Sequence, residues 1–284
     1  MKTGTTSLYH YLKSHPQVSM SSIKELDFFV EELNWHRGVR WYERQFARVS
    51  PGALAVGEAS ANYTKYPRYQ GVPARISSLL PHAKLVYVVR DPIERMRSHY
   101  EHGVAIGWER QPIERALFEN PAYLTASLYS MQIEQYLNHF PSSHLLVITS
   151  EDLRHSRKDT MRVVYEFLDV DHTYVSPQLG REFYKSEGRS SYSPAVAALR
   201  SVLKKRFPPS KRAKELVDSL VMWRRPSFAR NFPRRSESSA TPGSPWQRAV
   251  MSDEVRSRLE ATVCEDVSRL YAYVSGDFDG WGIA

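Results

Sequence analysis

The first residues of the chain carry side chains suited to binding a phosphate. The group consists of Lys2, Thr3, Gly4, Thr5, Thr6 and Ser7. A helical pattern of Leu and Tyr follows and must end at His15-Pro16. Glycine lets a backbone approach an anion, the free amides of a helix's first turn point at it, and lysine adds charge. The pattern predicts a phosphate loop; the alternative is that Thr and Ser merely cap an ordinary helix.

A second group suits another phosphate on the same ligand. Arg90 follows an apolar run, and Ser98 comes eight residues later, across a predicted helix start. The planar guanidinium of arginine can donate two hydrogen bonds to phosphate oxygens, and the hydroxyl of serine can donate a third. The alternative is a surface pair of Arg90 with Asp91 and a solvated Ser98. The ATP-type pattern G-x-x-x-x-G-K-[ST] does not occur, which counts against a P-loop kinase.

The elements that must position these residues alternate between strands and helices. Apolar runs at Ala53–Val56, Leu85–Val89 and Leu145–Ile148 predict buried parallel strands. Pro92 can open a helix, and the stretch Gln132–Leu137 continues one that must stop before Pro141. The order predicts an α/β fold: a P-loop-like, doubly wound parallel sheet flanked by helices, in one domain with a C-terminal helical extension.

The predicted sheet also indicates where a ligand would bind. Ligands of such sheets lie beyond the carboxyl ends of the strands. Glu58, Arg90 and the residues after Ile148 are therefore expected to face one crevice.

The domain is expected to span 1–284, with a core over 1–192, a basic and Pro-rich irregular segment over 200–250 and a final helix over about 252–274. The apolar residues expected on the docking face of that helix are Val255, Leu259, Val263, Val267, Leu270 and Tyr271.

The net charge is concentrated in one segment. The chain of 284 residues has 39 Lys and Arg against 31 Asp and Glu, a formal charge of +8. Residues 200–235 hold twelve Lys and Arg and two acids, so the rest of the chain sums to −2. A diffuse nucleic-acid surface is therefore disfavoured, and no nucleic-acid partner is expected. The segment is either a lid that attracts an anionic acceptor or a lipid surface, with peripheral membrane contact, or a solvated basic face.

The composition argues against disulfide-stabilised, metal-binding and membrane-spanning proteins. Cys264 is the single cysteine and the ten histidines show no ligand spacing, so no disulfide framework and no metal are expected. No apolar run approaches the roughly 20 residues of a membrane span. These features favour a soluble, cytoplasmic protein. Neither the acceptor nor the oligomeric state follows from the residues.

Three motifs in order, K-x-G-T-T-S, K-E-x-x-F-F and R-D-P-x-x-R-x-x-S-x-Y, resemble sulfotransferases that use 3′-phosphoadenosine 5′-phosphosulfate. The likeness is to the branch with heparan sulfate and bacterial enzymes, and it runs from residue 1 to about 192. It implies that the first loop holds the 5′-phosphosulfate, that Arg90 and Ser98 hold the 3′-phosphate, and that Gly188 and Arg189 close over the nucleotide. The sulfuryl acceptor would be a hydroxyl or amine of a small molecule, lipid or glycan.

The resemblance also implies a general base. Lys24-Glu25-Leu26-Asp27-Phe28-Phe29 looks like the family segment whose glutamate takes the acceptor's proton, which carries that role to Glu25. Lys2 would stabilise the charge that develops on the leaving phosphate oxygen. No metal and no covalent intermediate are needed.

The sequence departs from the family pattern in two places. The segment after Val56 resembles E-K-S-x-x-Y, but Ala59 replaces its lysine, and Glu58 becomes the runner-up base. Glu187 stands where a lysine is usual in the late loop. These departures keep open the alternative of a non-catalytic 3′-phosphoadenosine nucleotide-binding pseudoenzyme; the P-loop kinase is the third alternative.

Family members carry a buried strand before the first loop, whereas this sequence begins inside it. The hypothesis is that Met1 is an internal methionine of a longer protein. Without that strand, a gap or an open edge is expected in the middle of the parallel sheet.

Overall fold

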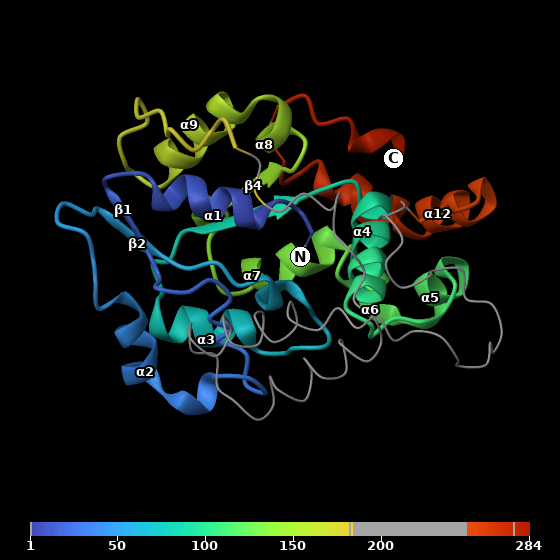
Figure 1. Ribbon diagram of the computed structural model, residues 1–284, viewed down its shortest axis with the longest axis horizontal. Helices are drawn as coiled ribbons and strands as arrows, with labels where there is room; N and C mark the ends of the chain where they lie inside the picture. Colours follow the sequence, from blue (N-terminus) through green and yellow to red (C-terminus); the bar gives the residue numbers. More distant parts are fainter. Residues whose placement is uncertain (1, 182, 184–248, 275) are drawn as a thin grey trace, which may run out of the picture.

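The computed structural model describes residues 2–181, 183, 249–274 and 276–284 (Figure 1). The predicted nucleotide-closing residues Gly188 and Arg189 and the basic segment 200–235 lie outside them. Across the described ranges, no helix is long and apolar enough to span a membrane.

In the described residues, four short parallel strands form the centre of the fold. They are β1 (Val18–Met20), β2 (Ala55–Gly57), β3 (Leu85–Val89) and β4 (Leu145–Thr149). β1 pairs with β2, and β3 pairs with β4 in the register Leu85 to Leu145. A single parallel bridge from Val147 to Val274 extends the second pair. The predicted α/β class with parallel strands and flanking helices is confirmed, although β1 was not predicted.

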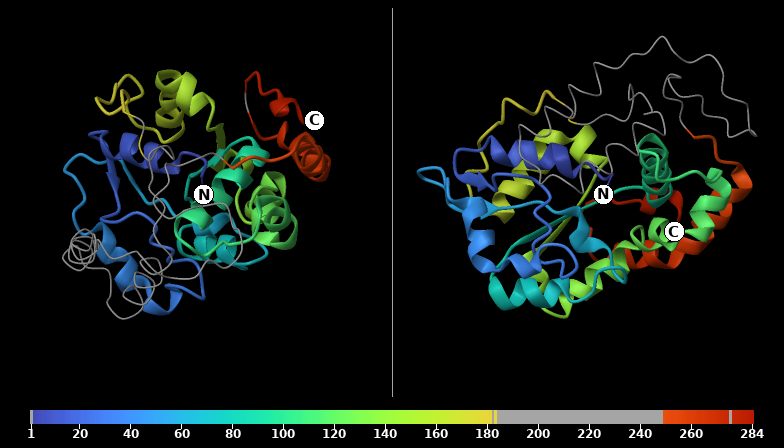
Figure 2. Two further views of the ribbon diagram at one scale, coloured as in Figure 1. Left: turned by 45° about the vertical axis from the view of Figure 1, so that its right-hand side comes forward. Right: turned by 60° about the horizontal axis from the view of Figure 1, so that its bottom comes forward.

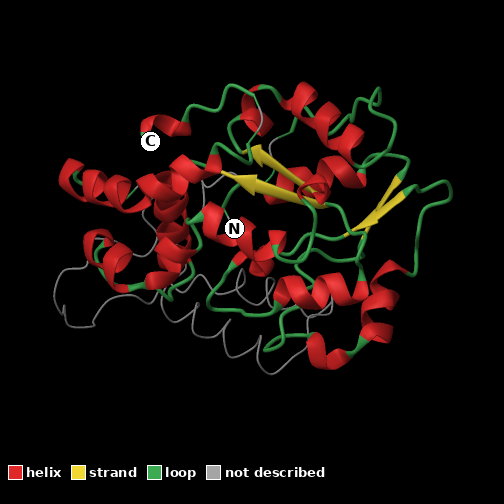
Figure 3. Cartoon of the chain, turned by 180° about the vertical axis from the view of Figure 1, so that it is seen from behind, coloured by secondary structure: helices red, strands yellow, loops and turns green. Residues whose placement is uncertain are grey.

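The sheet is divided into two separate pairs, unlike the continuous sheet that the strand pattern predicts (Figure 3). An apolar cavity of about 760 Å³ lies between β2 and β3. Next to it, Leu54 is 69% exposed and Val56 is 51% exposed. Strands of a parallel sheet are normally buried on both faces, so these exposures mark an open edge at β2.

Helices surround both strand pairs (Figures 1 and 2). Their bounds are α1 Thr5–Lys13, α2 Val39–Glu43, α3 Val72–Leu79, α4 Pro92–Ala105, α5 Ile113–Glu119, α6 Pro121–Thr125, α7 Tyr129–Leu137, α8 Asp152–His155, α9 Arg157–Phe167 and α12 Asp253–Leu270. As predicted, Pro92 opens α4; Asp91 caps it by accepting hydrogen bonds from the amides of Ile93 and Glu94 at 2.8 and 3.1 Å. A cap of this kind contributes about 1 kcal/mol.

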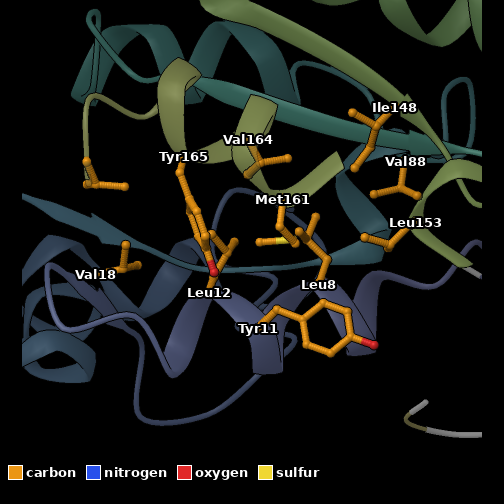
Figure 4. Packing of buried hydrophobic residues seen from close by; sticks show 11 residues of the cluster. Leu8, Tyr11, Leu12, Val18, Val88, Ile148, Leu153, Met161, Val164 and Tyr165 are labelled. Atoms are coloured by element: carbon orange, nitrogen blue, oxygen red, sulfur yellow. The ribbon is translucent and has the colours of Figure 1, made fainter. Parts of the chain in front are cut away.

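One core cluster fixes α1 against β1, β3, β4 and α9 (Figure 4). Leu8, Tyr11 and Leu12 of α1 are each at most 8% exposed and pack with Val164 and Tyr165 of α9. Burying a large apolar side chain contributes about 1.5–3 kcal/mol. This cluster holds the amino end of α1, and therefore the predicted phosphate loop, in a fixed position relative to β3 and β4.

The C-terminal helix α12 packs against α4, α5 and α6 (Figure 2). The predicted face is buried at the five positions Val255, Leu259, Val263, Val267 and Leu270. Tyr271 is an exception: it is 44% exposed, because α12 ends at Leu270 and Tyr271 is already its C-cap. Asp266 joins α12 to α7, since its carboxylate accepts hydrogen bonds from the amides of Ser130 and Met131, both at 2.9 Å.

Candidate functional site

The predicted phosphate loop opens α1 in a geometry suited to an anion. Gly4 is the N-cap and has φ 92° and ψ 5°, a left-handed conformation that glycine adopts without strain. Its carbonyl accepts hydrogen bonds from the amides of Ser7 and Leu8. The amides of Thr5 and Thr6 begin the helix and so have no acceptor within it. No acidic residue lies in this first turn, so the positive end of the helix dipole is not neutralised there.

A pocket of about 230 Å³ lies at this helix end. Its lining includes six of the predicted phosphate-binding residues: Lys2, Gly4, Thr5, Thr6, Ser7 and Ser98. Thr3 differs from its neighbours, since it is buried and lines the apolar cavity between β2 and β3. Thr5 lines both spaces.

The two sets of residues predicted to bind phosphate, the loop at Lys2–Ser7 and the pair Arg90 and Ser98, lie next to each other. The guanidinium of Arg90 donates a 3.2 Å hydrogen bond to the carbonyl oxygen of Lys2 and lies 3.7 Å from the carboxylate of Glu94. Arg90 follows β3, and Ser98 lies two turns along α4 with its side chain toward the pocket. The end of β3 and the start of α4 therefore bring a cation and a hydroxyl beside the loop, although Arg90 is not among the residues that line the pocket. The expectation that Glu58, Arg90 and the residues after Ile148 face one crevice is wrong, because Ser150 lines the pocket whereas Glu58 lines the apolar cavity.

Glu25 also lines this pocket, and its backbone is strained. Its φ is 60° and that of Asp27 is 49°, while Lys2 has φ 72°. Positive φ at a residue other than glycine costs of order 1–3 kcal/mol and persists only where surrounding contacts impose it. Here the contacts are an ion pair from Lys24 to the Glu25 carboxylate and a 2.7 Å hydrogen bond to it from the amide of Ala61. Strain at three residues next to one pocket is typical of a functional site.

Glu58, the runner-up base, occupies a different environment. It does not face the pocket with Glu25; it lines the apolar cavity instead. Its carboxylate accepts 2.7 Å hydrogen bonds from the hydroxyls of Tyr63 and Ser60. Burial raises the pKa of Glu58, and the hydrogen bonds from these hydroxyls and from Tyr42 oppose the rise. Its contacts are those of a residue that fixes the loop after β2.

Nine further residues that line the pocket were not predicted as site residues from the sequence: Tyr11, Lys24, Ala61, His102, Ser150, Leu153, Arg154, Arg157 and Phe183. Ser150 was signalled only as one of the residues after Ile148; its amide bonds to the Val89 carbonyl at 2.7 Å. Arg154 and Arg157 add cations from α8 and α9, so the pocket lining is strongly positive. A signal was available for both, since they follow the strand that ends at Thr149.

Phe183 is tied to the phosphate loop. Its amide donates to the Ser7 hydroxyl at 3.2 Å, and its ring stacks on His10 with centroids 4.2 Å apart. The ring also lies 6.0 Å from that of Tyr11. An aromatic face at the rim of a cationic pocket offers a planar group such as a purine a place to stack.

The histidines of α4 have unequal surroundings. His102 lines the pocket, whereas His99 is buried between Trp108 and Tyr123. Burial, then the nearby cations Arg95 and Lys65, lowers the pKa of His99 to about 2, so this imidazole stays neutral at physiological pH. In the described ranges, no group of three or more His, Cys, Asp or Glu side chains is placed to hold a metal ion.

Comparisons with known proteins agree with this geometry. The family model described as "Sulfotransferase domain" matches residues 1–194. Bifunctional heparan sulfate N-deacetylase/N-sulfotransferase 2 of Bos taurus is 30% identical over 189 residues, covering 60% of this chain and 21% of the relative. The related protein 1 of Xenopus laevis is 32% identical with the same coverage. The chain thus spans about a fifth of the length of these curated relatives.

A solved structure shares the fold over nearly the whole chain. The sulfotransferase from Alicyclobacillus acidocaldarius superimposes with a TM-score of 0.66 at 23% identity, covering 98% of this chain and 94% of that one. The family match extends over more than half of the sequence and includes the phosphate loop, Glu25, Arg90 and Ser98. The chain therefore belongs to the sulfotransferase family.

Proposed function

We propose that this protein transfers a sulfuryl group from 3′-phosphoadenosine 5′-phosphosulfate to a hydroxyl or amine of an acceptor. The observation that carries the proposal is one pocket that joins the phosphate loop, Ser98 and a strained, accessible Glu25. Arg90 is hydrogen-bonded to the carbonyl of Lys2 in the same loop. The acceptor is a small molecule, lipid or glycan. The printed names of the curated relatives, which describe heparan sulfate N-sulfotransferases, support a glycan.

In this proposal the donor lies along the amino end of α1. The amides of Thr5 and Thr6 and the cation of Lys2 bind the 5′-phosphosulfate, as helix ends bind anions. Ser98 and Arg90 bind the 3′-phosphate, and Phe183 stacks on the adenine. Arg154 and Arg157 supply further positive charge at the pocket wall. No bound metal is required, because side-chain cations neutralise the phosphates.

The reaction is a direct displacement at sulfur. Glu25 takes the proton of the acceptor hydroxyl or amine while the acceptor's oxygen or nitrogen forms a bond to sulfur. The bond between sulfur and the donor's bridging phosphate oxygen breaks, and the negative charge moves to that oxygen. Lys2 stabilises this charge, and the products are the sulfated acceptor and 3′-phosphoadenosine 5′-phosphate. General base catalysis of this kind contributes about 10²–10⁴-fold to the rate.

We assign the base to Glu25 and a supporting role to Glu58. The Glu25 carboxylate reaches the pocket, and Lys24 and Ala61 hold it in place. Glu58 uses its carboxylate to bind Tyr63 and Ser60, and it faces the apolar cavity. A base must reach the acceptor's proton, so geometry favours Glu25.

Titration with 3′-phosphoadenosine 5′-phosphate, followed by donor turnover with an acceptor panel, tests the proposal. Binding together with sulfated product supports it. Binding without turnover on any acceptor would favour the pseudoenzyme, for which Ala59 is the motivating residue. Phosphate transfer from ATP would favour the kinase. Contact with a membrane through 200–235 stays a prediction, since that segment lies outside the described residues.

A further inference from the structure

Arg95 of α4 carries a positive charge into the interior of the protein, and the proposed function gives it no role. Its side chain is 1% exposed. The guanidinium donates a 2.6 Å hydrogen bond to the Ser127 hydroxyl and a 2.7 Å hydrogen bond to the Tyr123 carbonyl. The other terminal nitrogen, Nη1, is buried and has no hydrogen-bond partner. Arginine stays protonated in proteins, so a full charge is buried here with one nitrogen unused.

No carboxylate forms an ion pair with Arg95 among the described residues. The neighbouring arginines differ: Arg90 lies 3.7 Å from the carboxylate of Glu94, and Arg97 pairs with the same carboxylate. Near Arg95 there are phenol groups instead, from Tyr87, Tyr123 and Tyr129. A buried charge without a counter-ion is strongly unfavourable. The described residues therefore leave a positive charge that an anion bound nearby would balance.

This charge lies next to the residues proposed to hold the 3′-phosphate. Ser98 lines the pocket and follows Arg95 by one turn of α4, and residues three apart are neighbours on a helix. Burial lowers the pKa of Arg95, the phenols oppose this decrease, and the positive charge of Arg90 adds to it. Buried charges are screened less by salt than exposed ones. An anion held by Arg90 and Ser98 would therefore be attracted by Arg95 as well.

The charge of Arg95 acts on groups to which it makes no hydrogen bond. Burial is the main cause that lowers the pKa of His99, and Arg95 is the next. Burial and the cation of Arg68 lower the pKa of the half-buried Lys65, and Arg95 adds to that decrease. Arg95 is not among the residues that line the pocket, so it can act on a bound nucleotide only through such a field.

We propose that Arg95 is a positioning residue whose buried charge strengthens binding of the donor's 3′-phosphate at Arg90 and Ser98. The inference rests on the proposed function, because the proposed donor supplies that phosphate. The phosphate balances a charge that the free protein leaves unbalanced. A nucleotide without a 3′-phosphate gains nothing from Arg95. The buried charge thus lowers the stability of the free protein and raises the affinity of the complex.

The test removes the charge of Arg95 and keeps the length of the side chain. Arg95→Met is the central variant, because methionine is unbranched, apolar and adaptable in a core. The Tyr123 carbonyl keeps a partner in this variant, since it also accepts a 3.1 Å hydrogen bond from the Ser127 hydroxyl. Arg95→Gln removes the charge but keeps hydrogen-bond donors, and Arg95→Lys keeps the charge. Ser127→Ala is the matched structural control, because it removes one hydrogen bond of Arg95 and leaves the charge in place.

Calorimetric titrations compare 3′-phosphoadenosine 5′-phosphate with AMP, which lacks the 3′-phosphate. For Arg95→Met and Arg95→Gln, affinity for the first nucleotide should fall about tenfold and affinity for AMP should change less than about twofold. Arg95→Lys and Ser127→Ala should stay within about threefold of the parent for both nucleotides. The thermal unfolding midpoint of free Arg95→Met should equal or exceed that of the parent, whereas that of Ser127→Ala should fall.

A purely structural role for Arg95 gives a different pattern. Equal losses of affinity for both nucleotides, or a loss in Ser127→Ala as large as that in Arg95→Met, would overturn the inference. So would a loss in Arg95→Lys as large as that in Arg95→Gln. The titrations are repeated at about 50 and about 500 mM NaCl, and the loss should persist at the higher salt because the charge is buried. A loss that disappears at the higher salt would also contradict the inference.

The parent protein separates this inference from the proposed function. It should bind 3′-phosphoadenosine 5′-phosphate more tightly than AMP. A parent protein that binds the two nucleotides equally would reject the proposed 3′-phosphate site, and the inference with it. A parent that prefers the 3′-phosphorylated nucleotide, with Arg95→Met and Arg95→Gln keeping the full preference, would reject the inference alone.

Discussion

The Glu25 carboxylate accepts a 2.7 Å hydrogen bond from the backbone amide of Ala61. The amide of Glu25 in turn donates to the carbonyl of Ala59 at 2.9 Å. The segment after β2 therefore holds both the backbone and the side chain of the proposed base. This explains how Glu25 keeps its positive φ while its carboxylate stays open to the pocket.

Replacing Glu25 by Gln should abolish most turnover and leave nucleotide binding nearly unchanged. The amide oxygen can still accept from Ala61, but it cannot take a proton. We expect kcat to fall by about 10²–10⁴-fold, measured with the best acceptor of the panel. Glu32→Gln, at an exposed site, is the control. Full activity of Glu25→Gln would transfer the base to another residue.

Replacing Arg90 by Gln should weaken binding only of nucleotides that carry a 3′-phosphate. Hydrogen bonds to charged groups contribute about 1.5–3 kcal/mol, so affinity for 3′-phosphoadenosine 5′-phosphate should fall about 10–100-fold. Affinity for AMP, which lacks that phosphate, should stay the same in calorimetric titrations. Arg97→Gln, which removes an arginine that pairs with Glu94 on the same helix, is the matched control. Equal losses for both nucleotides would contradict the assignment.

Replacing Gly4 by Ala should lower both stability and nucleotide affinity. The added methyl would meet the Leu153 and Ser150 side chains only at ordinary contact distances of 3.6 and 3.7 Å, so the left-handed φ is the main penalty. A penalty of about 1–2 kcal/mol is expected from thermal unfolding. Gly52→Ala has a similar φ of 80° and nothing within 4 Å, so it should lose stability but keep nucleotide affinity. Equal nucleotide affinity in both variants would argue against the loop as the anion site.

Replacing His99 by Phe should remove part of the loss of stability in acid. The folded pKa of His99 is lowered to about 2 from 6.5, mainly by burial, so the unfolded state takes up a proton that the folded state refuses. Stability contributed by the neutral imidazole is present above pH 6.5 and decreases as the pH falls toward 2. Unfolding midpoints at pH 5 and pH 7.5 should lie closer together in the variant. The control is His36→Phe, at an exposed site, and its unfolding midpoints at the two pH values should differ as much as those of the parent protein.

Replacing Glu58 by Gln should change the pH dependence in the opposite direction. Burial raises the folded pKa of Glu58 above its ordinary 4.5, so the folded state keeps a proton that the unfolded state releases. The protonated Glu58 carboxyl therefore contributes stability at low pH, and this stability decreases as the pH rises from 4.5 through the folded pKa. Thermal unfolding across that range should show a smaller decrease in the variant than in the parent or in Glu32→Gln. An unchanged profile would show that Glu58 titrates normally.

The sequence predicted the local features of the site better than its long-range features. Leu85–Val89 and the start of α4 at Pro92 follow from short-range signals, and they bring Arg90 and Ser98 to the loop. β1 was missed because three residues between turns give little periodicity. The motifs made Glu25 the candidate base and Glu58 the runner-up, and the structure adds that the two differ in burial and in hydrogen bonding. The cations Arg154 and Arg157 of α8 and α9 follow a predicted strand, but their spacing matches no motif, so the sequence analysis did not single them out.

The opening between β2 and β3 lies next to the proposed donor site. Thr3 and Thr5 line the opening, and Thr5 also lines the pocket. By thermodynamic linkage, an extended peptide that fills the opening and a nucleotide that binds the loop should each alter the other's affinity by the same factor. Exposed strand edges also template pairing between molecules. Self-association of this protein should therefore depend on its concentration and decrease when such a peptide is supplied.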